Sequence, residues 1–458
     1  MHGAPQPLSA LWPFIIISIT YLLFTVTDGA VRMLVLLHAY TKGFSAMEVA
    51  IMFSLYELMG AGTNLAAGVC GARWGIRATL LSGLTLQARS FAFTLIAGLA
   101  MLYGWTDDFS KLHAIIYVTA AQALCGVAKD LTKLGGKTVT KLVTPNERQG
   151  TLFKRVAGLT GYKNSLKGVG YFLGSALLTW SYVGAVSVMI ALIVVALPFA
   201  WFGLTTKLGR VSKKNITLRA VFEQTGNVNV LSLARLFLFG SRDLWFEVPL
   251  PYYLRSATGM EWPRPAVGAM LAGYIILYGQ VQAYAPQARS SIISHWSPYD
   301  RVGSPPNKHV CVFWNAVLLA CPVFMGSVST LLLGVVSFAI IFAINSAVHS
   351  YLIVKYSDGN KVAMNVGFYY MANAFGRLIG TIVSGALYSY VGEDENDGLA
   401  ACFLASSFFV VVSAVVSVRL DDDVGGFVCG RLCGGAEEEE EGEGEGEGEG
   451  GGGDVAFV

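Results

Sequence analysis

The residues best placed to do chemistry are lysines that lie inside or beside long apolar runs. Lys129, Asp130 and Lys133 fall in one such run, and Lys163 and Lys167 fall in the next. On insertion scales, a charge near the centre of a bilayer costs about 2.5–3.5 kcal/mol. A chain that keeps several such charges, mostly of one sign, is expected to use them. The pattern predicts an anion-binding cluster in the middle of a membrane protein.

The spacing of these lysines supports a shared site. Lys129 and Lys133, and likewise Lys163 and Lys167, are four residues apart, so each pair shares one helix face. At 1.5 Å per residue, Lys163 lies about 17 Å above the inner membrane boundary, roughly half of a 30 Å core. The alternative is that the lysines snorkel toward the cytoplasm. Snorkelling suits Lys133 better than Lys163 or Lys167.

Embedded cations outnumber embedded carboxylates, which favours an anionic substrate. A guanidinium group can donate two parallel hydrogen bonds to phosphate-like oxygens, whereas a lysine ammonium group acts as a point charge. The surplus suits a small polyanion such as a phosphorylated metabolite. The embedded cations are Arg32, Arg89, Lys129, Lys133, Lys163, Lys167, Arg235, Arg242 and Arg377. The predicted substrate contacts are Lys129, Lys163, Lys167, Arg32, Arg242 and Arg377.

The embedded carboxylates have two candidate uses, ion pairing and proton coupling. They are Asp28, Glu57, Asp130, Asp243 and Glu247, and we predict one of these uses for each of the first four. Glu57 or Asp28 could carry a proton, because burial favours the neutral carboxyl group. The alternative for Glu57 is an ion pair with a lysine. Asp28 could pair with Arg32, four residues on. The adjacent Arg242 and Asp243 are expected to point toward separate partners.

Bulk composition places most of the chain in a lipid bilayer. It has 458 residues, of which 54% are hydrophobic and 14% are charged, and its mean hydropathy is +0.55. Soluble chains carry about 25% charged residues. The apolar runs predict an all-α polytopic membrane protein with about 12 transmembrane helices. The predicted spans are 13–38, 46–70, 78–103, 112–136, 152–180, 182–205, 229–253, 266–288, 309–327, 329–354, 362–390 and 398–418.

A basic linker is predicted to divide the chain into two six-helix halves. The parts are an N-terminal half (1–205), a cytoplasmic linker (206–228), a C-terminal half (229–420) and a disordered Glu/Gly-rich tail (421–458). Lysine and arginine gather in alternate loops, which predicts that both termini are cytoplasmic. Two six-helix halves around a central site are the layout of major facilitator transporters. The segment from Gly68 to Arg77 resembles the signature of that superfamily, with Ala72 where an aspartate is usual.

No catalytic or cofactor motif stands out. The chain has no Gly-rich phosphate loop, no HExxH and no convincing Ser/His/Asp grouping, so we expect neither enzyme activity nor a cofactor. Cys429 and Cys433 lie in the string CGRLC. Two thiols alone are a weak metal signal, so no metal site is predicted. The expected partners are a small anionic phosphorylated substrate and the lipid bilayer, with no nucleic acid.

Several strings resemble those of one transporter family. They are TDGAVRMLVLLH (27–38), YELMGAGTNLAAG (56–68), AAQALCGVAKDLTKLGGK (120–137), GTLFKRVAGLTGYKNSLKGVGYFLG (150–174), NVLSLARLFLFGSRDLWFEVPLP (229–251) and YGQVQAYAP (278–286). Together they resemble the organoarsenical efflux permeases (ArsJ type) of the major facilitator superfamily. The match covers residues from about 20 to 290, and generic facilitators lack the KDLTK and YKNSLKG strings. Residues 290–420 match in layout more than in motif.

The resemblance implies a specific substrate and a functional link to one enzyme. In that family, glyceraldehyde-3-phosphate dehydrogenase uses arsenate in place of phosphate to make 1-arseno-3-phosphoglycerate, which the permease exports. The resemblance thus implies an alternating-access exporter in the plasma membrane that confers arsenate resistance. One alternative is an organic phosphate/phosphate exchanger of the same fold. An alternative of another class is a non-transporting membrane sensor that signals through the acidic tail.

Overall fold

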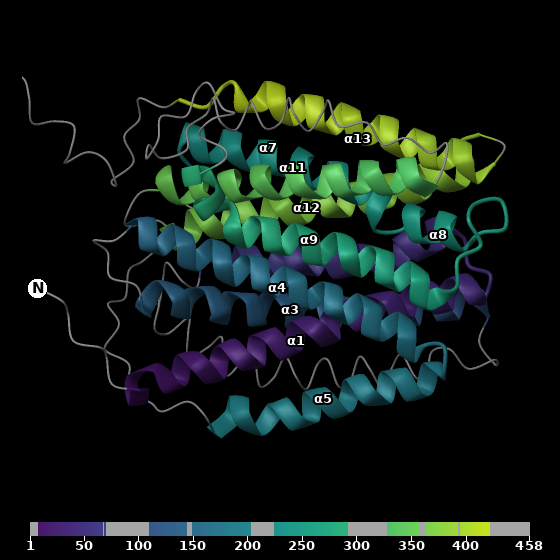
Figure 1. Cartoon of the computed structure of the whole chain (residues 1–458), viewed down its shortest axis with the longest axis horizontal. Helices are drawn as coiled ribbons and strands as arrows, with labels where there is room; N and C mark the ends of the chain where they lie inside the picture. Colours follow the sequence, from purple (N-terminus) through teal and green to yellow (C-terminus); the bar gives the residue numbers. More distant parts are fainter. Residues whose placement is uncertain are drawn as a thin grey trace, which may run out of the picture.

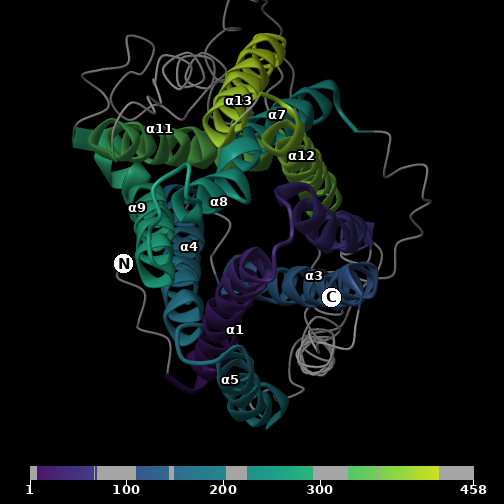
Figure 2. The ribbon, with the colours of Figure 1, turned by 90° about the vertical axis from the view of Figure 1, so that its right-hand side faces the viewer.

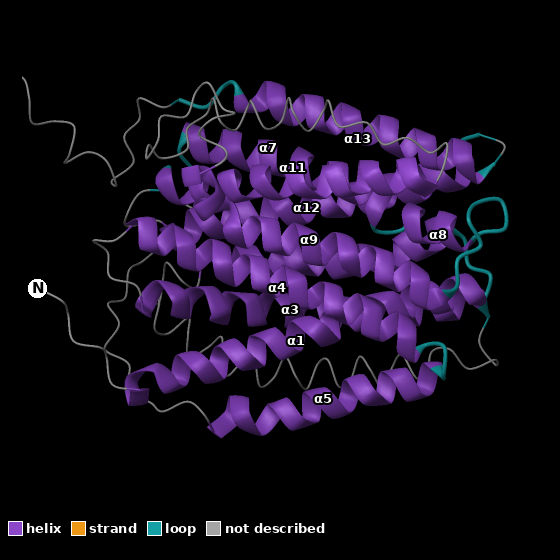
Figure 3. Ribbon diagram, in the orientation of Figure 1, coloured by secondary structure: helices purple, strands orange, loops and turns teal. Residues whose placement is uncertain are grey.

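The structure, a computed structural model, consists of helices joined by turns and short loops (Figure 3). It describes residues 8–66, 68–69, 110–143, 149–202, 224–291, 328–357, 362–392 and 394–421. Within these ranges there is no β-strand. The predicted spans 78–103 and 309–327, most of the linker and nearly all of the tail lie outside the described residues.

The helices run side by side along the long axis of the molecule (Figure 1). They are α1 (Leu8–Thr41), α3 (Lys111–Val143), α4 (Gln149–Leu177), α5 (Tyr182–Phe202), α7 (Gly226–Phe246), α8 (Pro249–Arg255), α9 (Arg264–Ser291), α11 (Val328–Lys355), α12 (Val362–Tyr390) and α13 (Glu395–Ser417). A further helical run covers residues 46–66, and we call it the 46–66 helix. In the described part of the chain, five helices are long and apolar enough to cross a membrane.

Ten of the predicted spans fall on described residues, and each coincides with helical structure. The predicted all-α polytopic fold is therefore confirmed. The largest differences from the predicted boundaries are in α3 and in the span 229–253. Helix α3 continues to Val143, well beyond the predicted end at residue 136. The predicted span 229–253 is interrupted, because α7 ends at Phe246 and α8 begins at Pro249.

Proline explains the interruption between α7 and α8. Pro249 has no backbone N–H, and its ring disfavours a helical conformation at the preceding Val248. Val248 adopts φ −124° and ψ −52°, and Pro249 stands in the first turn of α8, where an N–H needs no partner. The break leaves Glu247 in the turn, where its carboxylate reaches arginines of α1 and α12.

Helix α4 packs between α1 and α9 (Figure 2). Small residues allow close approach on both sides. A Cβ on Gly170 would collide with the backbone of Val26 and Ala30 in α1. On the other side, Gly161 of α4 and Gly279 of α9 face each other's backbone. The α4 lysines therefore lie on a helix that contacts both predicted halves of the protein.

Contacts at one end of the bundle join the two predicted halves. The Tyr252 hydroxyl donates to the Phe44 carbonyl at 3.0 Å, and the Met47 N–H donates to the Ser389 hydroxyl at 3.1 Å. Because the N-terminus is predicted to be cytoplasmic, the loop after α1 is predicted to lie outside the cell, and we call this end the outer end. The hydrogen bonds hold the two halves together there.

Candidate substrate-binding site

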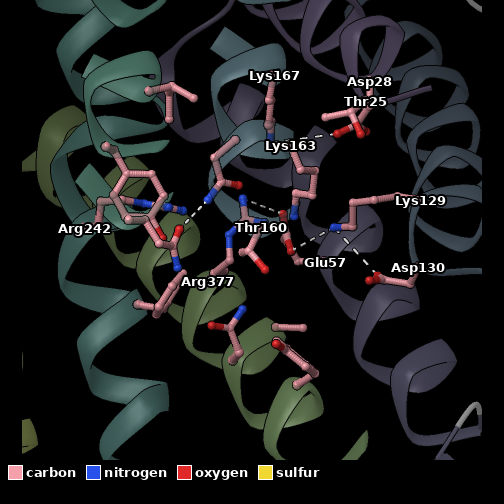
Figure 4. Close-up of a pocket in the computed structure, with 18 of the residues that line it drawn as sticks. Thr25, Asp28, Glu57, Lys129, Asp130, Thr160, Lys163, Lys167, Arg242 and Arg377 are labelled. Atoms are coloured by element: carbon pink, nitrogen blue, oxygen red, sulfur yellow. Dashed lines mark hydrogen bonds and ion pairs between the residues drawn. The ribbon is translucent and has the colours of Figure 1, made fainter. Parts of the chain in front are cut away.

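A cavity lies between the two predicted halves (Figure 4). Its lining comes from α1, the 46–66 helix, α3 and α4 on one side, and from α7, α9, α11 and α12 on the other. The cavity contains about 1060 Å³ of empty space, including its opening to solvent. The cavity thus opens to solvent, and both predicted halves contribute to its walls.

The cavity gathers the charged residues that the sequence predicted to form the site. Those in its lining are Asp28, Glu57, Lys129, Asp130, Lys163, Lys167, Arg242 and Arg377. Arg32 contacts Glu57, and Asp243 contacts Arg377, so both belong to the same cluster. The cluster draws on six separate helices. Arg89 and the side chain of Lys133 lie outside the described residues.

The two α4 lysines enter the cavity from the middle of their helix. Lys163 is the central residue of α4 and lines the cavity (Figure 4). Lys167 Nζ lies 3.9 Å from Asp28 Oδ2, and Asp28 also accepts a hydrogen bond from Tyr56 at 2.5 Å. Both lysines thus point into the protein, which argues against snorkelling for this pair.

Lys129 enters the same cavity from α3. Its Nζ lies 3.6 Å from Glu57 Oε2 and 3.8 Å from Asp130 Oδ2 (Figure 4). It also lies 4.0 Å from the centroid of the Tyr56 ring, close enough for a cation–π interaction. Of the two uses suggested for Glu57, an ion pair with a lysine is the one present in the structure. Proton coupling stays a prediction.

A buried charge network (Arg32, Glu57, Asp243, Glu247 and Arg377) joins the two predicted halves. Arg32 Nε of α1 lies 2.8 Å from Glu247 Oε2, in the turn after α7. Arg377 Nη2 of α12 lies 3.0 Å from Glu57 Oε1 on the 46–66 helix and 2.9 Å from Glu247 Oε1. Arg377 Nε lies 2.7 Å from Asp243 Oδ2. Arg32 and Arg377 therefore each contact carboxylates of both halves.

Two pairings differ from those that the sequence suggested. Arg32 contacts Glu57 and Glu247, whereas Asp28 contacts Lys167 and Tyr56, so the expected pair within α1 does not form. Arg32 reaches carboxylates of the 46–66 helix and of the turn after α7, and these compensate its charge in place of Asp28.

The second difference in pairing concerns adjacent residues on α7. Arg242 Nε donates to Asp243 Oδ1 at 2.7 Å, although separate partners were expected for the two side chains. The long arginine side chain can fold back along the helix toward its neighbour. Asp243 Oδ2 remains available to Arg377, at 2.7 Å. One carboxylate therefore serves two arginines.

Two residues of the site were not among the predicted contacts. Arg235 lines the cavity, where its Nε donates to Asn373 Oδ1 at 3.0 Å. Glu247 also lines it and contacts three arginines. A signal for Arg235 was present, because it precedes Arg242 by seven residues, and this spacing puts both on one helix face. The position of Glu247 depends on the break before Pro249, which the span prediction missed.

Cations exceed carboxylates in the described part of the site. The cations are Arg32, Lys129, Lys163, Lys167, Arg235, Arg242 and Arg377. The carboxylates are Asp28, Glu57, Asp130, Asp243 and Glu247. Seven cations against five carboxylates leave a formal surplus of two positive charges. Among the described residues, no group of three or more His, Cys, Asp or Glu side chains could hold a metal ion. The charge balance of the described site therefore favours an anionic ligand.

Solved transporter structures are similar to nearly the whole chain. One is a mutant of the nucleoside transporter NupG, with a TM-score of 0.62, 14% sequence identity and coverage of 89% of this chain and 99% of that one. Another is a bacterial homologue of the iron transporter ferroportin in an outward-facing state, with a TM-score of 0.62, 15% identity and the same coverage, 89% and 99%. No protein-family model and no curated protein matches the sequence.

The fold and the site together define the class of the chain. It is an all-α, multi-pass integral membrane protein with the fold of major facilitator transporters. The likeness to solved structures extends to the fold and not to the cargo. The resemblance to organoarsenical efflux permeases therefore stays a prediction.

Proposed function

We propose that the protein is a transporter that moves a small organic anion across the membrane by alternating access between its two halves. The observation that carries this proposal is the surplus of two positive charges in a cavity lined from both halves. A buried charge without a counter-ion is costly, so an anion that enters the cavity is stabilised there. Contact with both halves couples the bound anion to their relative movement.

The substrate we propose is 1-arseno-3-phosphoglycerate, whose export would confer arsenate resistance. Support comes from the strings that resemble organoarsenical efflux permeases. Two of these strings contain cavity lysines: KDLTK contains Lys129, and YKNSLKG contains Lys163 and Lys167. Phosphate and arsenate groups offer these cations tetrahedral oxyanions. Glyceraldehyde-3-phosphate dehydrogenase would supply the substrate to a plasma-membrane transporter with both termini in the cytoplasm.

The charge network offers a physical basis for alternating access. Arg32 with Glu247, and Arg377 with Glu57, each join one half to the other. A bound anion competes with these carboxylates for the arginines and weakens the link between the halves. The hydrogen bonds at the outer end, such as Tyr252 to Phe44, would then have to break for the substrate to leave.

The test uses purified protein in vesicles that enclose glyceraldehyde-3-phosphate dehydrogenase, its substrate, its cofactor and labelled arsenate. We expect labelled arsenic to leave the vesicles only while the dehydrogenase is active. Vesicles without the transporter measure leakage. Equal release of arsenic with and without active dehydrogenase would contradict the proposed substrate.

The same vesicles separate the alternatives. When they are loaded with 3-phosphoglycerate, rapid exchange with external phosphate would favour an organic phosphate exchanger. A sensor would give no flux of either compound. The cation surplus fits the exchanger as well as the exporter, so the flux measurement decides between them.

A further inference from the structure

Arg235 has a different environment from the ion-paired cations of the cavity. Its buried guanidinium stacks on Phe239, with Cζ 3.8 Å from the ring centroid. Nε donates to Asn373 Oδ1 at 3.0 Å, and Nη1 donates to Ser346 Oγ at 3.2 Å. All of these partners are neutral. Among the described residues, no carboxylate lies within ion-pair distance of Arg235, and its Nη2 donates no hydrogen bond.

Other cavity cations contact carboxylates. Arg377 contacts three of them, Arg242 contacts two, and Lys129 contacts two. Lys167 contacts Asp28. A buried guanidinium with only neutral partners keeps an uncompensated charge, which is costly. An anionic group of a ligand would compensate the charge of Arg235.

Arg235 and the α4 lysines approach the cavity from different halves of the protein. Arg235 belongs to α7, and the lysines belong to α4. Hydrogen bonds connect the two walls: Asn164 donates to Gln282 at 2.8 Å, Gln282 contacts Ser346 at 3.5 Å, and Ser346 accepts from Arg235. The cavity therefore has cations on both walls with neutral polar groups between them.

We propose that Arg235 binds one anionic end of the transported anion while Lys163 and Lys167 bind the other. A guanidinium group can donate one hydrogen bond to each of two oxygens of a phosphate, arsenate or carboxylate group. A ligand with one anionic end that binds the lysines leaves the charge of Arg235 uncompensated, so it binds more weakly. The inference rests on the proposed transport of an organic anion and assigns the recognition of its second anionic group to Arg235. Arg235 is then the residue that selects two-ended anions.

The test compares two ligands of nearly the same size. 3-Phosphoglycerate has an anionic group at each end, whereas glycerol 3-phosphate has a hydroxymethyl group in place of the carboxylate. Calorimetry on the purified full-length protein measures both affinities. We expect the wild type to bind 3-phosphoglycerate about 10- to 100-fold more tightly, the scale of a charge-assisted hydrogen bond. We expect Arg235→Gln to bind the two ligands about equally.

Two further variants control this experiment. Arg235→Lys keeps the positive charge but cannot donate two parallel hydrogen bonds. We expect this variant to have an intermediate preference for 3-phosphoglycerate. Arg419→Gln removes an exposed arginine beyond the end of α13 and should keep the full preference.

The outcomes separate this inference from the proposed function. An Arg235→Gln protein that keeps the wild-type preference would overturn the inference and leave the transport proposal standing. A wild type that binds both ligands equally would also overturn it, without any need for a variant. A wild type that binds neither ligand would overturn both the inference and the proposed substrate class.

Discussion

Arg377 in the charge network and Arg235 differ in how their buried positive charge is compensated. Arg377 contacts Glu57, Asp243 and Glu247 at 3.0, 2.7 and 2.9 Å, so its charge is compensated within the protein. Arg235 contacts only neutral groups among the described residues. The first arrangement is complete without a ligand, and the second lacks an anion. We infer that the network links the two halves, whereas Arg235 meets the substrate.

Breaking the network should have the largest effect on stability. Arg377→Gln removes a cation shared by three carboxylates, and breaking a buried pair costs about 3–5 kcal/mol. We expect a clear fall in the thermal unfolding midpoint in detergent and a loss of transport. The double variant Glu57→Gln/Arg377→Gln should recover part of the stability. An Arg377→Gln protein as stable as wild type would contradict the claim that the charge network stabilises the folded protein.

Removing a lysine from the substrate side should affect transport more than stability. Lys163→Ala takes away a cation at the middle of α4, so we expect flux to be abolished while the protein still reaches the membrane. The matched control is Lys111→Ala, since Lys111 is exposed at the start of α3. Vesicle flux and membrane fractionation measure the two properties. Normal flux in Lys163→Ala would place the site elsewhere.

The empty protein should tolerate the loss of Arg235 better than the loss of Arg377. Arg235→Gln leaves no described carboxylate without a cation, and only Asn373 and Ser346 lose a hydrogen-bond donor. Each such bond contributes about 1 kcal/mol. Thermal unfolding without ligand should therefore show a small shift for Arg235→Gln and a large one for Arg377→Gln. Equal shifts would remove the distinction between the two arginines.

Deleting the acidic tail should have the smallest effect. A deletion of residues 422–458 keeps Asp421, whose backbone N–H donates to Asn227 Oδ1 at 2.9 Å. We expect the truncated protein to keep its flux and its unfolding midpoint, because a segment made mostly of Glu and Gly cannot bury an apolar core. The measurement compares the flux of the truncated and full-length proteins in vesicles. A loss of activity on truncation would favour the sensor alternative.

Much of the fold could be predicted because apolar run length determines where a membrane helix can form. The runs identified ten helical regions among the described residues. The interruption at Val248 was missed, although Pro249 and Pro251 mark it in the sequence. Span length was given more weight than the local effect of proline. A proline inside an apparent span is therefore a reason to expect a break, and here the break positions a carboxylate of the site.

The members of the site were more predictable than their pairings. A charge in an apolar run stands out in the sequence, so most charged members of the cluster could be named. Pairing depends on how helices rotate and pack, which no local pattern records. Arg235 illustrates this limit, because its partners Asn373 and Ser346 lie 138 and 111 residues away. The sequence could identify Arg235 as an embedded cation, but it could not reveal that its partners are neutral.

The central claim is that the cavity carries an organic anion across the membrane. The most direct test measures release of labelled arsenic from dehydrogenase-loaded vesicles by the wild type and Lys163→Ala side by side. The account predicts release by the wild type alone, and only while the dehydrogenase is active. Equal release by both proteins, or release that does not depend on the dehydrogenase, would contradict it.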